Sequence, residues 1–330
     1  MQFLRRHLLR SIAGAGMLAI LSAIGTSTFD RPASAETRTI RIVTPVPPGG
    51  TTDILARLLA DQVGRRPGVS VVVENRPGAG TVIGSDAVAR AAPDGNTLLI
   101  NTTGLLISPY LQKATFDPRT SFEPICQLVS SPTVFVVHGA SPYHTMNDLI
   151  AAARAKPGEV TMGSIGPASA YQLGLEALKR AAKVDITYVP FPGSAPAINA
   201  LLGQHVASVF AGYANVAELI KAGKVRALAV ASQARIQPLP DTPTVAEAGY
   251  KDFEVDNWFG LFAPGKTPDA TASQLADWFT EAVKADEIRP KLLTHGLFPV
   301  ARCGADFAAL IRDQYAKFGQ IIRDANIQGK

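Results

Sequence analysis

Apolar and polar positions follow a repeated unit along the chain. Each unit is a short apolar stretch typical of a strand, a loop rich in glycine or other small residues, and a stretch with apolar positions at helical spacing. The first units predict strands at 40–46, 69–74, 97–101 and 131–137, and helices at 53–63 and up to Ala91. This order is typical of a mostly parallel sheet that is covered by helices.

The same pattern restarts after residue 138 and predicts a second lobe of the same kind. Its expected elements are helices at 146–155, 169–181, 196–203 and 214–222, and strands at 160–163, 186–189, 206–211 and 227–231.

The apolar segment at 253–262 is followed by two helices, at 269–285 and 304–325. These elements are too few for a third domain, so we expect them to return to the first lobe. The chain then crosses between the lobes near His138 and Asp256, where a hinge is expected. The sequence thus predicts an α/β fold with a discontinuous first lobe and a continuous second lobe, at 36–137 plus 256–330 and at 138–255.

The first residues predict a signal peptide at 1–35. Three arginines lie within the first ten residues, the stretch at 11–24 is apolar, and 33–35 reads Ala-Ser-Ala, which favours cleavage before Glu36. A membrane anchor is the alternative, but this glycine-containing stretch is shorter than the ~20 residues of a spanning helix. We therefore expect a periplasmic protein. The paired arginines leave both the general secretory route and the twin-arginine route open.

The loss of this peptide changes the charge of the protein. Residues 1–35 hold four Arg and one Asp, so the formal net charge of +5 falls by 3 to +2 in the mature chain. No cluster of Lys and Arg remains that resembles a nucleic-acid face, and we expect no nucleic-acid partner. Cys126 and Cys303 are compatible with one disulfide or with two buried thiols, and the spacing decides neither.

Two segments resemble nucleotide-binding loops. Residues 260–267 satisfy the phosphate-loop pattern, but Pro264 lacks an N–H group to donate, and Thr267 as N-cap with Pro268 at the first helical position explains the segment better. The glycines at 78, 80 and 84 have a spacing one residue longer than a dinucleotide turn and lack its acidic partner at a strand end. Neither segment predicts a nucleotide site.

Hydrolases and metal enzymes lack the residues that they need. The sequence contains neither a G-x-S-x-G nucleophile elbow nor an HExxH motif, and no histidine is placed by sequence to activate a serine. We therefore expect no catalytic residues, no metal and no cofactor.

Three loops instead have the pattern of anion sites. Residues 47–52, 164–169 and 193–195 each precede a predicted helix with small or hydroxyl residues, so they direct backbone N–H groups and the positive end of the helix dipole outward. Taken singly, each is more often a helix cap. Two such loops on different lobes predict a cleft of the size of a carboxylate.

Five segments, in order along nearly the whole mature chain, resemble the Bug-type substrate-binding receptors of tripartite tricarboxylate transporters. They lie at 45–57, 73–80 with 83–84, 92–98, 188–193 with 196–197, and 239–249 with 258–260. The resemblance implies a type II periplasmic-binding fold, a two-lobed Venus flytrap that closes on a carboxylated ligand. The ligand-binding residues that it implies are Pro48, Gly49, Gly50, Thr51, Thr52, Asp53, Asn101, Thr102, Thr103, Ser164, Gly166, Ala168, Ser169, Phe191, Gly193, Ser194 and Ala195.

This chain departs from the family pattern at positions of the second lobe. Gln172 stands where a His is common, Phe191 and Pro192 replace a Tyr and a Lys, and Ala207 replaces an Asp. The resulting wall is less polar, which favours an aromatic or aliphatic carboxylate over an amino acid or citrate.

The resemblance implies a monomeric receptor, not an enzyme, that passes its ligand to membrane transporter subunits. The same binding chemistry would serve a sensor for a two-component kinase, and the sequence does not separate these outputs. A periplasmic hydrolase with Ser164 or Ser169 as nucleophile is the remaining alternative.

Overall fold

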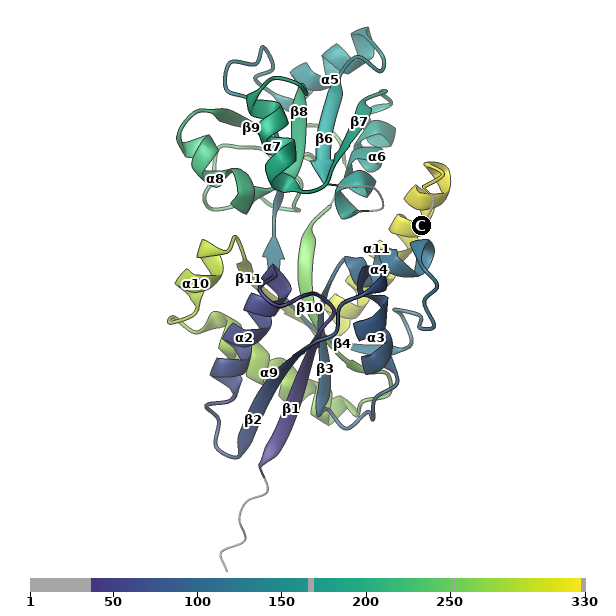
Figure 1. Cartoon of the computed structure of the whole chain (residues 1–330), viewed down its shortest axis with the longest axis vertical. Coiled ribbons are helices and arrows are strands. Elements are labelled where there is room, and N and C mark those ends of the chain that lie inside the picture. Colours follow the sequence, from purple (N-terminus) through teal and green to yellow (C-terminus); the bar gives the residue numbers. More distant parts are fainter. Residues whose placement is uncertain (1–36, 166–168, 252, 254, 328–330) are drawn as a thin grey trace, which may run out of the picture. The chain divides into compact units, whose positions relative to one another are not determined.

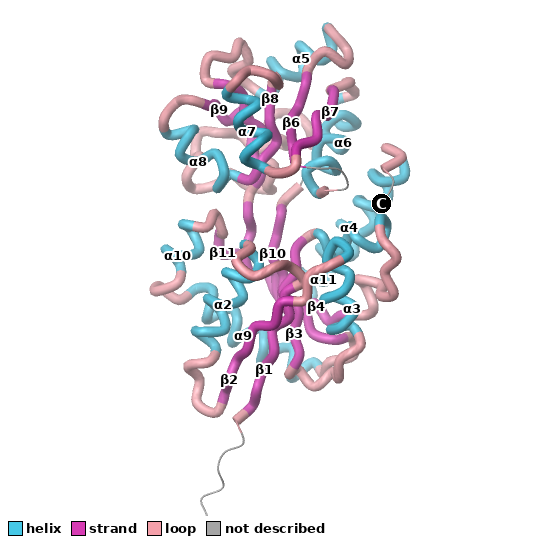
Figure 2. Tube along the Cα trace, viewed as in Figure 1, coloured by secondary structure: helices cyan, strands magenta, loops and turns pink. Residues whose placement is uncertain are grey.

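The computed structural model describes residues 37–165, 169–251, 253 and 255–327. From Arg38 onward the chain forms one compact unit. The expected signal peptide at 1–35 lies outside the described residues. Two sheets and the helices on their faces make up this unit (Figures 1 and 2), which confirms the predicted α/β class.

The first sheet is built from the beginning and the end of the chain, in the order β11-β4-β10-β3-β1-β2. Its strands are β1 (Arg38–Thr44), β2 (Val69–Asn75), β3 (Thr97–Thr102), β4 (Phe122–Ser131), β10 (Asn257–Pro264) and β11 (Phe298–Cys303). The helices that belong with it are α2 (Thr51–Val63), the 3-10 turn η2 (Ala79–Thr81), α3 (Val82–Ala89), α4 (Gly104–Leu111), α9 (Asp269–Lys284), α10 (Arg289–Thr294) and α11 (Gly304–Asp324). We call this sheet and its helices the first region.

The second sheet has the order β7-β6-β8-β5-β9. Its strands are β5 (Thr133–His138), β6 (Thr161–Ile165), β7 (Thr187–Phe191), β8 (Ser208–Gly212) and β9 (Val225–Val230). The accompanying helices are α5 (Met146–Ala155), α6 (Ala170–Ala182), α7 (Ser194–Leu202) and α8 (Tyr213–Lys221). We call this sheet and its helices the second region.

The expectation of mostly parallel sheets is wrong, because both sheets are mixed. Strands joined by a helix run parallel: β1 pairs with β2 and β3, and β6 pairs with β7 and β8. The strands next to the two crossings run antiparallel to their neighbours, since no crossover helix turns the chain back there. Thus β10 is antiparallel to β3 and β4, and β5 is antiparallel to β8 and β9.

Alternate residues of the first sheet fill different cores. Ile42 packs in a cluster with Leu55 and Leu59 of α2 and with residues of α9. The next residue, Val43, packs in a separate cluster with residues of α4 and α11. Since successive side chains of a strand point to opposite faces, helices must cover this sheet on both sides. A similar pair of clusters occupies the two faces of the second sheet.

The two cysteines form a disulfide. Cys126 of β4 and Cys303 of β11 lie directly opposite each other in the strand register and are bonded, 177 residues apart in sequence. This settles the alternative that the sequence left open. The disulfide joins the strand at one edge of the first sheet to its neighbour.

The segment that resembles a phosphate loop is strand and turn. Residues up to Pro264 belong to β10, and α9 begins at Asp269 with Pro268 as its N-cap. The expected N-cap role of Thr267 is therefore wrong. Its buried hydroxyl donates back to the carbonyl of Pro264 at 2.8 Å, and no side chain caps α9.

The segments that connect the two sheets are hydrogen-bonded to each other. Thr133 Oγ1 donates to the carbonyl of Val255 at 2.8 Å, and Ser130 Oγ donates to the carboxylate of Asp256 at 2.6 Å. The second crossing lies close to the predicted Asp256. The first lies between Ser131 and Thr133, one strand before the predicted His138, because β5 already belongs to the second sheet.

Candidate functional site

The loop between β1 and α2 ends in a helix start without a side-chain cap. Gly50 is the N-cap of α2, and no side chain accepts a hydrogen bond from the first turn. Gly49 has φ of 82°, a left-handed conformation that glycine adopts without strain. Thr51 is exposed, whereas Thr52 is buried. Backbone N–H groups at the start of α2 are thereby left to other acceptors.

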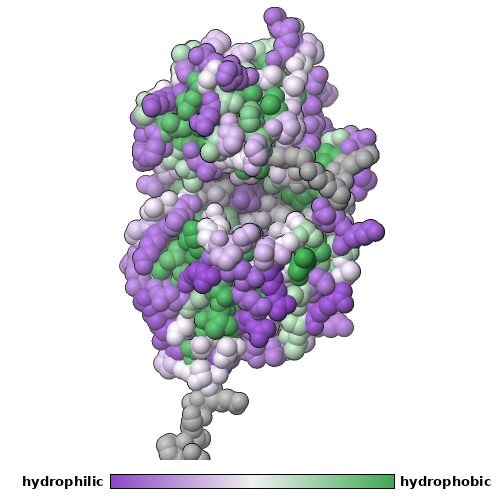
Figure 3. Space-filling view, in the orientation of Figure 1, coloured by the Kyte–Doolittle hydropathy of each residue, from purple (hydrophilic) through white to green (hydrophobic). Residues whose placement is uncertain are grey.

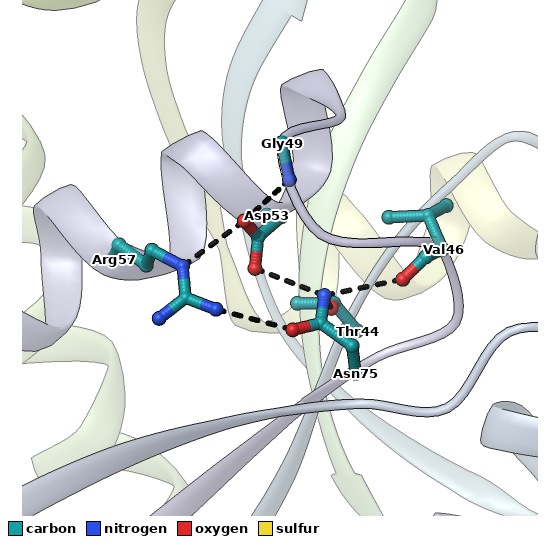
Figure 4. A network of polar contacts seen from close by, with 6 residues as sticks. All are labelled: Thr44, Val46, Gly49, Asp53, Arg57 and Asn75. Carbon is teal, nitrogen blue, oxygen red and sulfur yellow. Dashed lines mark hydrogen bonds and ion pairs between the residues drawn. The ribbon is translucent and has the colours of Figure 1, made fainter.

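Asp53 holds this loop in place through a network of polar contacts. Its Oδ2 accepts from the backbone N–H of Gly49 at 2.9 Å and from Arg57 Nε at 3.0 Å, and its Oδ1 accepts from Asn75 Nδ2 at 2.9 Å. Asn75 also donates to Thr44 Oγ1 and to the carbonyl of Val46, as Figure 4 shows. Asp53 was expected to contact the ligand, but here both of its oxygens are used to shape the loop.

The Asp53 carboxylate is stabilised in its charged form. Burial acts to raise its pKa, but the hydrogen bonds from Arg57, the Gly49 N–H and Asn75, together with the charge of Arg57, lower the pKa below its ordinary value. The negative charge therefore persists beside the helix start, neutralised by Arg57 at 3.0 Å.

The corner between β3 and α4 supplies three more of the expected residues. Asn101 is 1% exposed, and its amide donates to Ser85 Oγ at 3.0 Å while its carbonyl oxygen accepts from the N–H of Thr102. Thr102 Oγ1 accepts from the Gly104 N–H at 3.2 Å. Thr103 Oγ1 donates to Asn257 Oδ1 at 3.1 Å. These contacts fix the start of α4.

The corner between β6 and α6 is held by neutral hydroxyl groups. Ser164 is fully buried, and its Oγ donates to the carbonyl of Phe210 at 2.7 Å. Ser169 is the N-cap of α6: its Oγ accepts from the Gln172 N–H at 3.2 Å and donates to the carbonyl of Ile165 at 2.9 Å. Tyr188 donates to the same carbonyl at 2.8 Å. The expected ligand residues Gly166 and Ala168 lie outside the described residues.

The corner between β7 and α7 carries the last expected residues. Gly193 is the N-cap of α7, and the backbone there is extended. Ser194 Oγ accepts from Asn215 Nδ2 at 3.3 Å, and Ala195 is exposed. Phe191 packs against Gly163, where an added Cβ would lie 3.0 Å from the ring. The Phe191 ring therefore packs against the neighbouring strand β6.

A pocket of about 290 Å³ lies between the β3–α4 and β6–α6 corners. Of the expected ligand residues, it brings together Thr102, Thr103 and Ser169. The other expected residues that the structure describes lie outside its lining. The sequence reasoning missed the rest of its wall, which is Gly80, Gly104, Ile107, Ser108, Leu111, Gln112, Ile165, Ala170, Tyr171 and Asn257.

The missed residues had a weak signal in the sequence. Ile107 and Leu111 are four residues apart and look like a core-facing helical stripe. Tyr171 and Asn257 lie far apart in sequence and meet at the pocket only through the fold. The signal in the sequence that does predict part of this pocket is the end of a strand at Thr102 and Thr103, because ligands bind outside the carboxyl ends of parallel strands.

The described residues show neither a metal centre nor an activated Ser164. They contain no group of three or more His, Cys, Asp or Glu side chains arranged to hold a metal ion. Ser164 donates to a backbone carbonyl, which does not act as a general base. Within the same residues, no helix is both long and apolar enough to cross a bilayer. The face in Figure 3 mixes hydrophilic and apolar patches over both regions.

Comparisons with known proteins agree with this architecture. Residues 55–327 match the model of the tripartite tricarboxylate transporter family receptor. The curated protein BugT of Bordetella pertussis is 32% identical over 321 residues, which cover 95% of this chain and 98% of BugT. The structure of a TctC solute binding protein from Polaromonas is 27% identical, with a TM-score of 0.82 over 87% of this chain and 99% of that chain. An R. palustris protein solved with adipate is 32% identical, with a TM-score of 0.70 over 89% and 99%.

Proposed function

Because this chain belongs to the receptor family of tripartite tricarboxylate transporters, we propose that it is an extracytoplasmic receptor for a small organic carboxylate. The family consists of periplasmic solute-binding proteins, and this chain has their fold. The proposal concerns the ligand, the residues that hold it and the partner that receives it.

The observation that carries the proposal is the shared lining of one pocket. Thr102 and Thr103 come from the strand end of the first sheet, and Ser169 comes from the helix start after β6 of the second sheet. Ligands of α/β folds bind outside the carboxyl ends of parallel strands. A ligand here touches both regions, so its binding favours one arrangement of the two.

The carboxylate binds at the uncapped start of α2. Thr51 and Thr52 supply the backbone N–H groups, because the N–H of Gly49 is bound by Asp53 and that of Gly50 by the carbonyl of Pro47. The helix dipole favours a negative charge at this end. Asp53 acts as a positioning residue, since its own charge is neutralised by Arg57. The adipate in the R. palustris relative supports a carboxylate as the ligand class.

The second region provides the less polar wall. Phe191, with Gln172 in place of the common His, favours an aromatic or aliphatic carboxylate over an amino acid or citrate. The lobes that close on it are the first region and the second region, and β5 (Thr133–His138) counts with the second. The mature protein acts as a monomer in the periplasm and delivers its ligand to membrane transporter subunits.

Thermal unfolding tests this proposal. The mature protein, freed of bound ligand, is heated with a panel of aliphatic and aromatic mono- and dicarboxylates. A carboxylate at a hundred times its Kd should add about 2.7 kcal/mol to the free energy of unfolding. A panel without any stabilising carboxylate would contradict the proposal.

Gly50→Val tests the place of the carboxylate. The Gly50 backbone has φ of −72°, and an added Cβ would approach other atoms only to 3.5 Å, so the variant should fold. The new side chain covers the start of α2, and we expect the ligand-induced shift to disappear. Ala151→Val, at an exposed position of α5, adds similar bulk far from the loop and should keep the shift. Equal shifts in both variants would exclude this loop.

A further inference from the structure

A groove of about 430 Å³ lies between α6 of the second region and α11 of the first region. No described residue lines both this groove and the pocket at the β3–α4 and β6–α6 corners. From α6 it takes Ala177, Arg180 and Ala181, which are three and four residues apart and so share one face of that helix. An ion pair between Arg180 and Asp324 joins the same two helices. The groove therefore has one wall from each region.

The wall from α11 is one face of that helix. The residues of α11 that form it include Gln314, Lys317, Phe318 and Ile321. Their spacing of i, i+3, i+4 and i+7 places them in one stripe along the helix. At 1.5 Å per residue, this stripe extends over about 10 Å. The groove is therefore long enough for a short chain or a single ring.

The floor of the groove is apolar. Phe253 and Val255, from the segment that leads into β10, are 5% and 4% exposed, and Phe318 of α11 is 3% exposed. The small side chains of Ala177 and Ala181 stand opposite this floor on α6 and leave space beside them. An apolar body of a ligand is buried favourably on such a surface.

Gln314 is a buried amide with one end unused. It is 5% exposed, and its Oε1 accepts from Trp258 Nε1 at 2.7 Å. An indole N–H only donates, so this bond fixes the amide oxygen toward Trp258 and leaves the NH₂ group free of it. No described residue accepts from this NH₂ group. Its nitrogen is not completely enclosed, unlike Thr81 Oγ1, Ser108 Oγ and Gln127 Oε1, which are buried without a partner. An acceptor oxygen in the groove can therefore reach it and gain a hydrogen bond.

The rim of the groove favours a negative charge. Lys317 is exposed, lies one turn from Gln314 on the same face, and forms no ion pair with a described carboxylate. Lys251 also lines the groove. Its sequence neighbours Asp252 and Glu254 lie outside the described residues, so we take the charge from α11 alone. A carboxylate at Gln314 lies close enough to the Lys317 ammonium to be stabilised by it.

We propose that this groove is a second ligand site, which takes a small amphipathic carboxylate such as a medium-chain acid. The carboxylate accepts from the Gln314 NH₂ group beside Lys317, and the apolar chain packs along Phe318 and Ile321. The site does not depend on the start of α2, so the inference goes beyond the proposed function. An occupant touches both regions and favours the arrangement in which α6 and α11 adjoin.

Octanoate, octanamide and butyrate are the probes that test this site. Calorimetric titration is carried out with the mature protein and with its Gly50→Val variant, in which the start of α2 is covered. Octanoate should bind to both proteins. Butyrate lacks four methylene groups and should bind more than about tenfold more weakly. Octanamide lacks the charge and should bind about threefold more weakly.

The indole N–H of Trp258 reports whether the groove is occupied, because its acceptor is Gln314. The chain contains one other tryptophan, Trp278, which lies on α9 against Arg38 and Arg66. In ¹⁵N-labelled protein, octanoate should move the Trp258 indole signal and leave the Trp278 signal in place. Trp278→Phe assigns the two signals.

Gln314→Glu should weaken octanoate binding by at least about tenfold. The variant keeps an oxygen for Trp258 but turns a second oxygen, with a like charge, toward the carboxylate. Gln274→Glu adds the same charge at an exposed position of α9 and should leave the affinity unchanged.

Ala181→Leu is a second variant that does not disturb the buried amide. It fills the groove from an exposed position of α6, so the protein should fold and octanoate binding should again fall by about tenfold. Ala151→Leu, at an exposed position of α5, adds the same bulk away from the groove and should leave the affinity unchanged.

Three results would overturn the inference: no octanoate binding to the Gly50→Val protein, a Trp258 signal that stays in place, or equal affinities in the two groove variants and their controls. If Gly50→Val removes octanoate binding and both groove variants keep it, octanoate binds at α2, so the proposed function stands and only the second site is lost. If Gln314→Glu removes octanoate binding while no carboxylate of the thermal panel responds to Gly50→Val, the groove stands and the carboxylate site at α2 fails.

Discussion

The β1–α2 and β6–α6 corners have the same topology but are held by different chemistry. At the β1–α2 corner, the buried charge of Asp53 is bound by Gly49, Arg57 and Asn75, and the helix start has no side-chain cap. At the β6–α6 corner, Ser164 donates to a backbone carbonyl and Ser169 caps the helix itself. The first loop is tied to Asp53 and leaves the N–H groups of the first helical turn to a ligand, whereas the second caps its helix with its own serine.

Under the proposed function, the two corners contribute differently to ligand binding. The α2 start is built in advance for a negative charge, because its network is complete without ligand. The second corner adds neutral hydrogen bonds and apolar surface, which discriminate between ligand bodies but contribute little to the capture of the charge. The first region should therefore determine affinity for carboxylates as a class, and the second region should contribute mainly to the choice among them.

Of the changes that we predict, removal of the disulfide should have the largest effect, and it should lower the stability of the first region. The bond closes 177 residues of sequence and lies wholly in the first sheet. Cys126→Ala with Cys303→Ala should lower the free energy of unfolding by about 2–5 kcal/mol. Trp258 and Trp278 both belong to the first region, so tryptophan fluorescence in denaturant follows it.

Reductant is the control for this variant. It should destabilise the wild type to the level of the double variant and leave the double variant unchanged. Fluorescence midpoints that are equal for the two proteins in the absence of reductant would mean that the covalent link does not strengthen the first region.

Asp53→Asn should have the next largest effect. The substitution keeps the size of the side chain but turns an NH₂ group toward the donors of Gly49, Arg57 or Asn75. We expect a loss of about 2–3 kcal/mol in the free energy of unfolding, together with weaker carboxylate binding. Asp61→Asn, in an exposed pair with Arg65 on the same helix, should have little effect on either quantity.

The pH dependence of stability distinguishes the loss of the Asp53 charge from a nonspecific loss of stability in the Asp53→Asn variant. The pKa of Asp53 is lowered in the folded protein, so its contribution is complete above the ordinary aspartate value and is lost as the pH falls toward the folded value. Asp53→Asn should therefore lose less stability than the wild type over this acidic range. Parallel stability curves for the two proteins would show that Asp53 has no such role.

Tyr188→Phe should have the smallest effect and tests the second corner. It removes one neutral hydrogen bond to the Ile165 carbonyl, which should cost about 0.5–1.5 kcal/mol. Tyr250→Phe removes a comparable bond to Asn147 away from the corner. Titration with a bound carboxylate should show weaker binding only for Tyr188→Phe. Equal binding by both variants would place the corner outside the ligand site.

The sequence predicted those helices and strands of both regions in which apolar residues recur with a clear helical or strand period. It missed β4, in which Glu123, Pro124 and Gln127 interrupt the apolar run. It also missed α4, which contains Pro109 and follows β3 after one residue. The direction of β5 and β10 depends on where the chain enters each sheet, and local periodicity carries no information about this.

The candidate site was predicted in part, for a similar physical reason. Thr102, Thr103 and Ser169 were accessible to prediction because they stand at strand ends and helix starts. Ser108 was not, because an inward-facing serine on an apolar helix has the same sequence pattern whether or not its hydroxyl finds a partner. The role of Asp53 within its own loop depends on Asn75 of the neighbouring strand, a contact that the register of β1 and β2 creates.

The place of β10 between β3 and β4 limits the order in which the chain can fold. The second sheet uses only residues between Thr133 and Val230, so its pairings can form as soon as that stretch is available. The first sheet stays split until β10 emerges, more than a hundred residues after β4. Long-range pairings of this kind form slowly. A folding chain would therefore present its first sheet as unpaired strand edges beside a second region that has already folded.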